Sequence, residues 1–245
     1  MTVTRLGIVA PPAGDREVLL DVRAEWPAAP DRLARTDRVC HLALLAAYRA
    51  LGEPRGGDRP IAVVYGSGHA SLVTNLRYYD KILRRGPRGA DPKRFPYTSP
   101  NAAAGEVAIA FGLTGPNISV TSGFASGLEA IAIGARLVAR GRAPAALVVA
   151  ADAWADEVGA LLSGAGLQTA DGPREGAAAL LLEPDAAPGA RGVLDEIRSG
   201  RRAAQPGPVT PAPAPLFALP AGRSLELSAA CPLSGGWAAV RWAPT

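Results

Sequence analysis

The stretch from residue 115 to residue 140 constrains the fold of this chain more than any other. Residues 118–121 read Ile-Ser-Val-Thr, and the Gly-Pro before them and the Ser-Gly after them bound a short buried strand. A helix follows, because apolar residues then recur at three- and four-residue spacing: Leu128, Ile131, Ala132, Ala135 and Val138. The sequence therefore predicts a strand, a tight turn and a helix that needs protein around most of its circumference.

The turn between this strand and this helix presents Phe124. Many enzymes hold a nucleophile at such a turn, since it lifts one side chain clear and the helix N-terminus offers N–H groups to developing negative charge. A phenyl ring cannot be a nucleophile. Ser122 and Ser126 are the alternative candidates for a stand-alone acyl-transferring enzyme, but no motif sets a histidine against either serine, and small polar residues in tight turns usually serve backbone geometry.

Length and composition narrow the class of protein. A chain of 245 residues, 48% of them hydrophobic, can bury a large core, so we expect one large domain or a domain with a tail. The net charge of +4 would suit an acidic partner, yet basic side chains are not interleaved with stacking aromatics, and we expect no binding of nucleic acid. Cys40 and Cys231 are the only cysteines and form no CxxC motif, so neither a disulfide framework nor a metal site is expected.

The N-terminal residues lack a basic segment that leads into a long apolar core, and no apolar run approaches the ~20 residues that span a bilayer. We therefore expect a cytoplasmic protein without a membrane span. The segment Gly66-Ser-Gly68-His69 resembles a phosphate-binding loop only superficially, because it has neither a third glycine nor a following Lys-Ser, and we expect no cofactor.

Strand and helix patterns alternate along the chain. Strands are predicted at 6–10, 61–65, 145–152, 177–183 and 193–197, helices at 37–51, 70–85 and 102–111, and a terminal pair of strands at 224–227 and 237–242. This alternation indicates an α/β fold with a mostly parallel sheet and helices on both faces. The proline-rich stretch around residues 205–220 indicates a linker.

Two polar residues and one face of a predicted helix stand at positions where they could have a functional role. His41 lies inside a predicted helix with no acid, cysteine or serine motif set against it, which favours a structural role. Asp152 ends a predicted strand and is either a site residue or the cap of the next turn. In the helix 70–85, Leu72, Asn75 and Tyr79 share one face.

Several segments together resemble the N-terminal half of a β-ketoacyl synthase, an enzyme of the thiolase fold that elongates fatty acids and polyketides. They are Asp37-Arg38 through Leu51, the run from Ile61 to Gly68, the run from Pro100 to Pro116, Thr121-Ser-Gly-Phe-Ala-Ser-Gly127, and the run from Glu175 to Glu183. The resemblance implies a truncated thiolase-like fold, with a half domain at 1–200, the linker at 201–222, and C-terminal strands at 223–245 that pack on the same domain.

Active synthases carry a cysteine where this chain has Phe124, and no acyl thioester can form on a phenyl ring. The catalytic histidines of the family belong to its C-terminal half, and this chain has no histidine after His69. The chain thus resembles the chain length factor of a type II polyketide synthase, especially the short relatives from polyene-forming systems. Such a subunit is not an enzyme. It forms a heterodimer with a full-length ketosynthase and helps to wall the tunnel for the growing acyl chain.

The resemblance also assigns surfaces. Leu72, Asn75 and Tyr79 match tunnel-facing positions, and the strand residues Asn117, Ile118, Ser119, Val120 and Thr121 match a dimer interface. An acyl carrier protein is the second expected partner. The basic residues Arg77, Lys81, Arg84, Arg85 and Arg88 are weak candidates for its docking, because a solvated basic face is the simpler explanation.

A half-length thiolase fold would expose the apolar helix after Phe124 unless a partner or the C-terminal strands covered it. On this ground too a partner is expected. A self-associating acyl-binding protein remains a further alternative.

Overall fold

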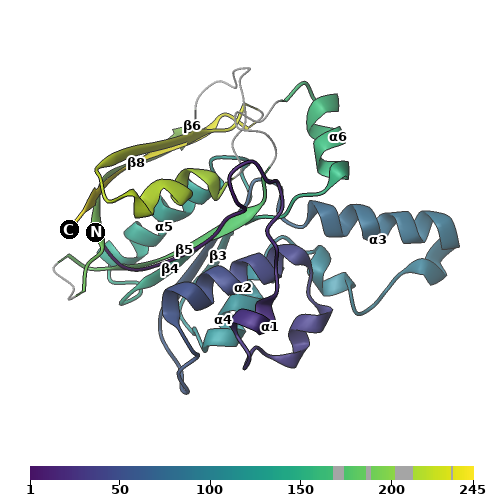
Figure 1. The fold of residues 1–245 in the computed structure, drawn as a ribbon, viewed down its shortest axis with the longest axis horizontal. Helices are drawn as coiled ribbons and strands as arrows, with labels where there is room; N and C mark the ends of the chain where they lie inside the picture. The colour runs from purple at the N-terminus through teal and green to yellow at the C-terminus, as the bar shows by residue number, and fades with distance from the viewer. Residues whose placement is uncertain (168–173, 186–188, 202–211, 233) are drawn as a thin grey trace.

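One mixed sheet of eight strands, in the order β3-β2-β4-β5-β1-β6-β8-β7, organises the computed structural model, which describes residues 1–167, 174–185, 189–201, 212–232 and 234–245. Figure 1 shows helices on both faces of this sheet. The strands are β1 (Thr2–Val9), β2 (Ala62–Gly66), β3 (Asn117–Val120), β4 (Ala146–Asp152), β5 (Gly176–Glu183), β6 (Gly192–Arg201), β7 (Leu225–Ala230) and β8 (Gly236–Pro244).

The α/β thiolase-like fold is as expected, but the expectation of a mostly parallel sheet was wrong. β2 pairs in parallel with β3 and with β4, whereas the other neighbouring strands pair antiparallel. That expectation followed from the continuous apolar runs of β4 and β5, which are buried along nearly their whole length. Continuous apolar runs are typical of parallel strands, but strands covered by helices on both faces are apolar in either direction.

The helices are α1 (Val22–Glu25), α2 (Arg38–Leu51), α3 (Leu72–Arg85), α4 (Ala102–Phe111), α5 (Ser126–Ala139) and α6 (Asp156–Gly164), with 3₁₀ turns η1 (Asp31–Arg35), η2 (Gly86–Gly89), η3 (Phe95–Thr98) and η4 (Ala214–Ala221). Four of the helices, α2 to α5, lie where local sequence signals predict them. Asp37 caps α2 by accepting a hydrogen bond from the backbone N–H of Cys40 at 3.2 Å. Gly112 ends α4 in the left-handed conformation. The sequence analysis did not predict α1, α6 or the four 3₁₀ turns.

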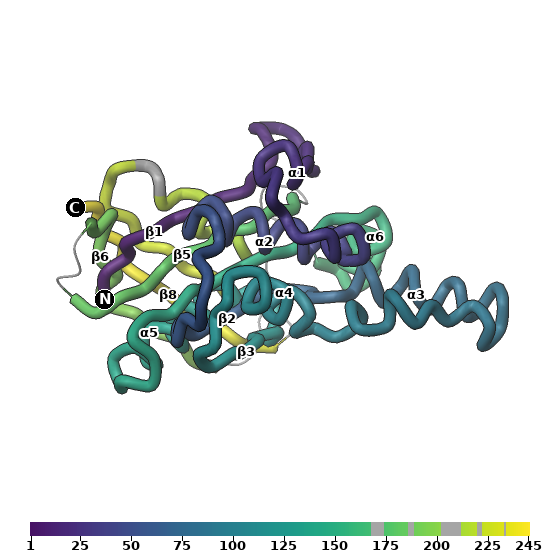
Figure 2. The backbone as a smooth tube through the Cα atoms, turned by 90° about the horizontal axis from the view of Figure 1, so that it is seen from below, coloured from purple at the N-terminus to yellow at the C-terminus, as the bar shows by residue number. Residues whose placement is uncertain are grey.

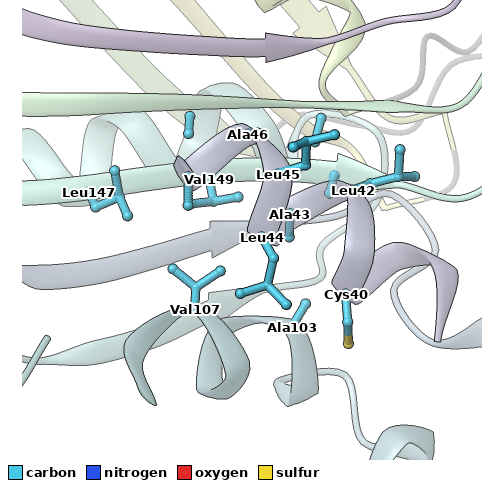
Figure 3. Packing of buried hydrophobic residues seen from close by; sticks show 14 of the residues in the cluster. Cys40, Leu42, Ala43, Leu44, Leu45, Ala46, Ala103, Val107, Leu147 and Val149 are labelled. Atoms are coloured by element: carbon cyan, nitrogen blue, oxygen red, sulfur yellow. The ribbon is translucent and has the colours of Figure 1, made fainter. Parts of the chain in front are cut away.

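Helices α2 and α4 cover one face of the sheet. Leu44 of α2, Val107 of α4 and Leu147 and Val149 of β4 belong to the same buried cluster (Figure 3). The small side chains of α4, such as Ala103, let it approach α2 closely. This face therefore buries a core of its own.

Helix α5 lies on the opposite face and is enclosed by the sheet itself. It contacts β2 and β4 on one side and β6 and β8 on the other, because the C-terminal strands curl over it (Figure 1). Leu128 and Ile131 are fully buried in the cluster that also contains Val240 and Trp242 of β8. The C-terminal strands thus cover this helix, and its apolar surface alone does not require a partner.

Helix α3 projects from the rest of the molecule. Figures 1 and 2 show it extending away from the sheet, at the end of the molecule opposite the two chain termini. Thr74 is its single buried residue, and its contacts are with η2, η3 and α6. A helix with so little of its surface packed is suited to contact another molecule.

Two parts of the predicted domain division, the C-terminal strands and the linker, can be compared with the structure. β7 and β8 extend the same sheet as β6, next to residues of the half domain. Of the segment 201–222, for which a linker was predicted, residues 202–211 lie outside the described residues. Residues 214–221 form η4, in which Leu216 and Leu219 are buried.

Candidate functional site

The candidate site is the turn between β3 and α5, and its central side chain is enclosed. Phe124 is 5% exposed and packs with Leu167 and Cys231, with Leu162 beside them. Leu162 lies in α6, Leu167 in the segment after it, and Cys231 in the connection between β7 and β8. The phenyl ring therefore fills a space inside the protein instead of reaching solvent.

The backbone of this turn requires a glycine next to Phe124. Gly123 has a φ of +103°, and a Cβ atom at this position would collide with the sulfur of Cys231. Ser234, in the connection between β7 and β8, lies against the turn, since it donates a hydrogen bond from Oγ to the carbonyl oxygen of Ser122. The C-terminal part of the chain thus closes over the turn.

The two serines of the turn are occupied in holding it. Ser126 is fully buried, donates from Oγ to the carbonyl of Gly123, and accepts from the N–H of Ser122 at 3.1 Å. Ser122 donates from Oγ to the carboxylate of Glu129. Within the described part of the chain neither serine has a histidine partner, so the arrangement lacks the base that would activate a serine nucleophile.

The two histidines lie elsewhere. His41 has its Nε2 2.9 Å from the carbonyl oxygen of Leu33, which ties α2 to η1 and fits the structural role expected of it. His69 has its Nε2 3.9 Å from Oδ1 of Asp152. Neither imidazole is hydrogen-bonded to the turn that holds Phe124, among the residues that the structure describes.

Asp152 lies beneath the turn and organises the loop that follows β2. It is 1% exposed, accepts hydrogen bonds from Ser67 Oγ and from the N–H of Gly68 at 2.9 Å, and accepts a further bond from the N–H of Ala212 at 2.7 Å. Among the described residues, these hydrogen bonds join Asp152 to the loop after β2 and to Ala212 and not to the turn that follows β4, so the expected cap of that turn was wrong. Gly66 and Gly68 serve close packing, since a Cβ on Gly66 would collide with the backbone of Ser126.

A second buried carboxylate, that of Glu175, joins three segments of the chain. The sequence analysis did not identify this structural role. Glu175 is fully buried and receives two hydrogen bonds from the guanidinium of Arg38, one of them from Nε at 2.8 Å. It also accepts from the N–H groups of Val18 at 2.7 Å and Trp154 at 3.2 Å. The hydrogen bond to Glu175 raises the pKa of Arg38. This cluster fixes the start of β5 against α2 and offers no open position for a reactant.

The face of α3 predicted to line a tunnel carries exposed apolar side chains. Leu72 and Asn75 are half-buried near the base of the helix, whereas Tyr79 is 64% exposed. Leu83, one turn farther, is 82% exposed and was not among the predicted residues, although its i+4 spacing from Tyr79 would have found it. The projecting end of α3 therefore presents an apolar strip.

The basic residues of α3 are partly neutralised. Arg84 pairs with Asp80 at 2.7 Å, and Arg77 lies 3.7 Å from Glu157 of α6. Lys81, Arg85 and Arg88 make no ion pair with any residue in the described ranges. The positive face predicted from the sequence is thus reduced to these three cations.

Strand β3 forms one edge of the sheet. It pairs only with β2, and its residues Asn117 to Val120 are half-buried or exposed, as is Thr121 after it. Asn117 donates from Nδ2 to the carbonyl of Ala104 at 3.2 Å, whereas the buried Oγ of Ser119 has no hydrogen-bond partner in the part of the chain that is described. This edge is free to pair with another strand.

No helix among the described residues is long and apolar enough to cross a membrane. The described residues also contain no group of three or more His, Cys, Asp or Glu side chains that could hold a metal ion.

Comparison with known proteins places this geometry in context. The sequence profile of "Beta-ketoacyl synthase, N-terminal domain" matches residues 23–185. The 3-oxoacyl-[acyl-carrier-protein] synthase 2 of Coxiella burnetii is 36% identical over 85 residues, which are 35% of this chain and 20% of that protein. The matched part thus spans about a fifth of that relative's length.

Two solved structures share the fold over the whole chain. The ishigamide ketosynthase/chain length factor superposes with a TM-score of 0.79 at 20% identity, covering 99% of both chains. The complex of the ketosynthase ApeO with its chain length factor ApeC from Xenorhabdus doucetiae superposes with a TM-score of 0.65 at 19% identity, again over 99% of both chains.

Proposed function

Because this chain belongs to the β-ketoacyl synthase family through its N-terminal domain, we propose that it is a non-catalytic chain length factor of a polyketide or fatty-acid-like elongation system. In this role it forms a heterodimer with a full-length ketosynthase and shapes the acyl tunnel of that partner. The partner supplies the cysteine, the histidines and all of the chemistry. The structures similar to this chain include ketosynthase and chain length factor complexes, which supports the proposal.

Phe124 is the observation that carries the proposal. The family resemblance puts the nucleophilic cysteine of active synthases at this position, and a phenyl ring cannot accept an acyl group. The ring is buried against Leu167 and Cys231, so the turn is filled and no substrate atom can approach it. The strand and helix around Phe124 then matter as scaffold.

The edge strand β3 is the proposed dimer interface. A free edge bordered by half-buried apolar side chains, such as Ile118 and Val120, is a template for pairing with a strand of a partner. The unpaired hydroxyl of Ser119 would gain a hydrogen-bond partner there. A stable interface centred on residues Asn117 to Thr121 would bury about 2,000 Å² or more.

The projecting helix α3 is the proposed tunnel element. Apolar side chains on a projecting helix, as at Tyr79 and Leu83, are stabilised when another surface covers them. Inserted into the partner, this strip would limit the length of the acyl chain, with Leu72 and Asn75 nearer its base. An acyl carrier protein would approach the unpaired cations Lys81, Arg85 and Arg88 of the same arm.

Co-expression with a cognate full-length ketosynthase tests the proposal. We expect a one-to-one heterodimer on size-exclusion chromatography, and we expect Val120→Lys in β3 to abolish it. Val120→Thr, which keeps the β-branched shape, is the matched control and should retain the complex. An isolated chain that becomes covalently acylated by an acyl thioester, or a homodimer that excludes the ketosynthase, would refute the proposal.

A further inference from the structure

Four arginine side chains converge on one hollow at the end of the molecule opposite the tip of α3. The hollow has a volume of about 400 Å³, and its cations are Arg5, Arg55, Arg59 and Arg191. The remaining lining residues are Thr4, Leu51, Leu181, Glu183 and Gly189. It lies in a different region from both the turn at Phe124 and the proposed partner surfaces.

The positive charge of this hollow is not neutralised within the described residues. None of the four guanidinium groups takes part in an ion pair or a side-chain hydrogen bond there, in contrast to Arg77 and Arg84 of α3. Glu183 is the single carboxylate of the lining, and it already accepts a hydrogen bond from Thr4 Oγ1. The negative end of the α2 dipole near Leu51 amounts to roughly half a charge, which cannot balance four cations.

The environment of Arg59 changes the pKa of its guanidinium group. Burial, and then the neighbouring charges of Arg55 and Arg5, lower the pKa of Arg59 from its usual value. An anion placed between these residues would offset the repulsion among the guanidinium groups. The free protein therefore holds an arrangement that is unfavourable for it alone and favourable for a negatively charged ligand.

The backbone holds three of these arginines in position before any ligand arrives. Arg5 is paired with Leu181 across β1 and β5, and Arg191 donates from its backbone N–H to the carbonyl of Val3 at 2.8 Å. Arg59 donates from its N–H to Gly112 and accepts from the N–H of Thr114, each at 2.8 Å. A ligand would thus have to order only the side chains, because the backbone of these residues is already fixed. This lowers the entropic cost of binding.

We propose that this arginine hollow binds a small molecule that carries two or more phosphate groups, such as the diphosphate part of a nucleotide or of a nucleotide-type coenzyme. Guanidinium groups match phosphate oxygens with paired N–H donors, and four of them exceed what one phosphate needs. A volume of about 400 Å³ lies within the range of small-ligand sites. Leu51 and Leu181 offer an apolar wall for the remainder of the molecule.

Calorimetric titration of the full chain, in complex with its ketosynthase where the complex forms, tests this proposal with inorganic pyrophosphate and ADP as probes. We expect saturable one-to-one binding that weakens as salt rises from 25 to 150 mM, because the contact is ionic. We expect Arg59→Gln combined with Arg191→Gln to raise the Kd at least tenfold. The matched control removes the same charge from α3, with Arg84→Gln and Arg85→Gln, and should change the Kd less than twofold.

The two probes distinguish a nucleotide-type ligand from one recognised by its phosphate groups alone. Tighter binding of ADP than of pyrophosphate would assign a nucleotide-type ligand, and equal binding would assign the phosphates alone. Where the double variant loses its cooperative thermal transition, Arg191→Gln alone, at an exposed position, replaces it. The proposal is overturned by the absence of saturable binding at 25 mM salt, by equal weakening in the control, or by a glutamate-rich peptide that binds as tightly as pyrophosphate. The last result would make the hollow a contact for an acidic protein.

Discussion

Gly68 lies directly against Phe124: a Cβ atom added to Gly68 would stand 2.9 Å from Cδ1 of the phenyl ring and 3.1 Å from Oδ2 of Asp152. The loop after β2 and the turn before α5 are therefore fitted to each other. The bulk of Phe124 and the absence of a side chain at residue 68 are two parts of one packing arrangement.

The first prediction follows from this contact. Gly68→Ala should lower the free energy of unfolding by about 1–3 kcal/mol, because the added methyl group overpacks the site. Phe124→Leu in the same chain should recover part of the loss, since the smaller side chain leaves room. Urea unfolding of the two single variants and the double variant measures the coupling. Simple additivity of the two effects would contradict the contact.

The second prediction concerns the lost nucleophile. Phe124→Cys should leave the chain without condensing activity, because no histidine is hydrogen-bonded to the turn within the described residues and the sequence has none after His69. It should also lower stability by about 2–4 kcal/mol through the cavity it leaves. Acyl-thioester labelling followed by mass spectrometry, together with a condensation assay on the isolated variant, checks the first point, and urea unfolding checks the second. Turnover by the variant alone would show that the scaffold is still catalytic.

The third prediction concerns the buried pair of Arg38 and Glu175. Glu175→Gln should destabilise the protein by about 3 kcal/mol, because it leaves the partly buried guanidinium without its anion. Asp195→Asn is the matched control: it breaks the exposed pair with Arg241 and should change the unfolding midpoint little. If both variants unfold alike in urea, the Glu175 cluster does not have the structural role assigned to it.

The fourth prediction is a pH dependence. Burial, followed by the charge of Glu106, raises the pKa of Tyr97 from 10.0 to about 12. Between these two values the unfolded chain releases the phenolic proton and the folded protein keeps it, so this contribution to stability is complete below pH 10 and is lost as the pH rises towards 12. In thermal melts, the midpoint should fall less steeply above pH 10 for Tyr97→Phe than for the natural chain. Parallel curves would exclude Tyr97 as a source of the loss.

The fifth prediction tests the proposed tunnel role. Tyr79→Ala, and separately Leu83→Ala, should leave the stability of the chain nearly unchanged because both side chains are exposed. In the reconstituted heterodimer, each should lengthen or broaden the distribution of products. Arg84→Ala, on the same helix, is the control and should not alter product length. An unchanged product profile in the Tyr79 and Leu83 variants would end the tunnel assignment.

Much of the fold was predictable from local signals. The cap at Asp37, the left-handed Gly112 and the apolar spacing after Phe124 lie where the structure begins or ends its helices. Strand direction was not predictable in the same way. The residues of β5 are apolar because α2 and α5 cover both of its faces, and this burial has the same pattern for parallel and antiparallel neighbours.

The candidate site, too, could be predicted from the sequence only in part. Phe124 was identified from its turn and from the family resemblance, and the face of Leu72, Asn75 and Tyr79 from its spacing, although their function remains a proposal. Leu83 was missed even though its spacing indicated it. The arginine hollow could not be found in this way, because Arg5 and Arg191 are distant in sequence and meet only across paired strands.

The sequence by itself determined where most of the helices and strands form and that position 124 holds a phenyl ring, which cannot be a nucleophile, since these depend on residue type and on spacing within a few residues. Only the tertiary structure decided what covers α5, which edge of the sheet stays free and which charges gather in one place. Those features depend on contacts between residues far apart in the chain, such as Ser122 with Ser234, and local patterns carry no information about them.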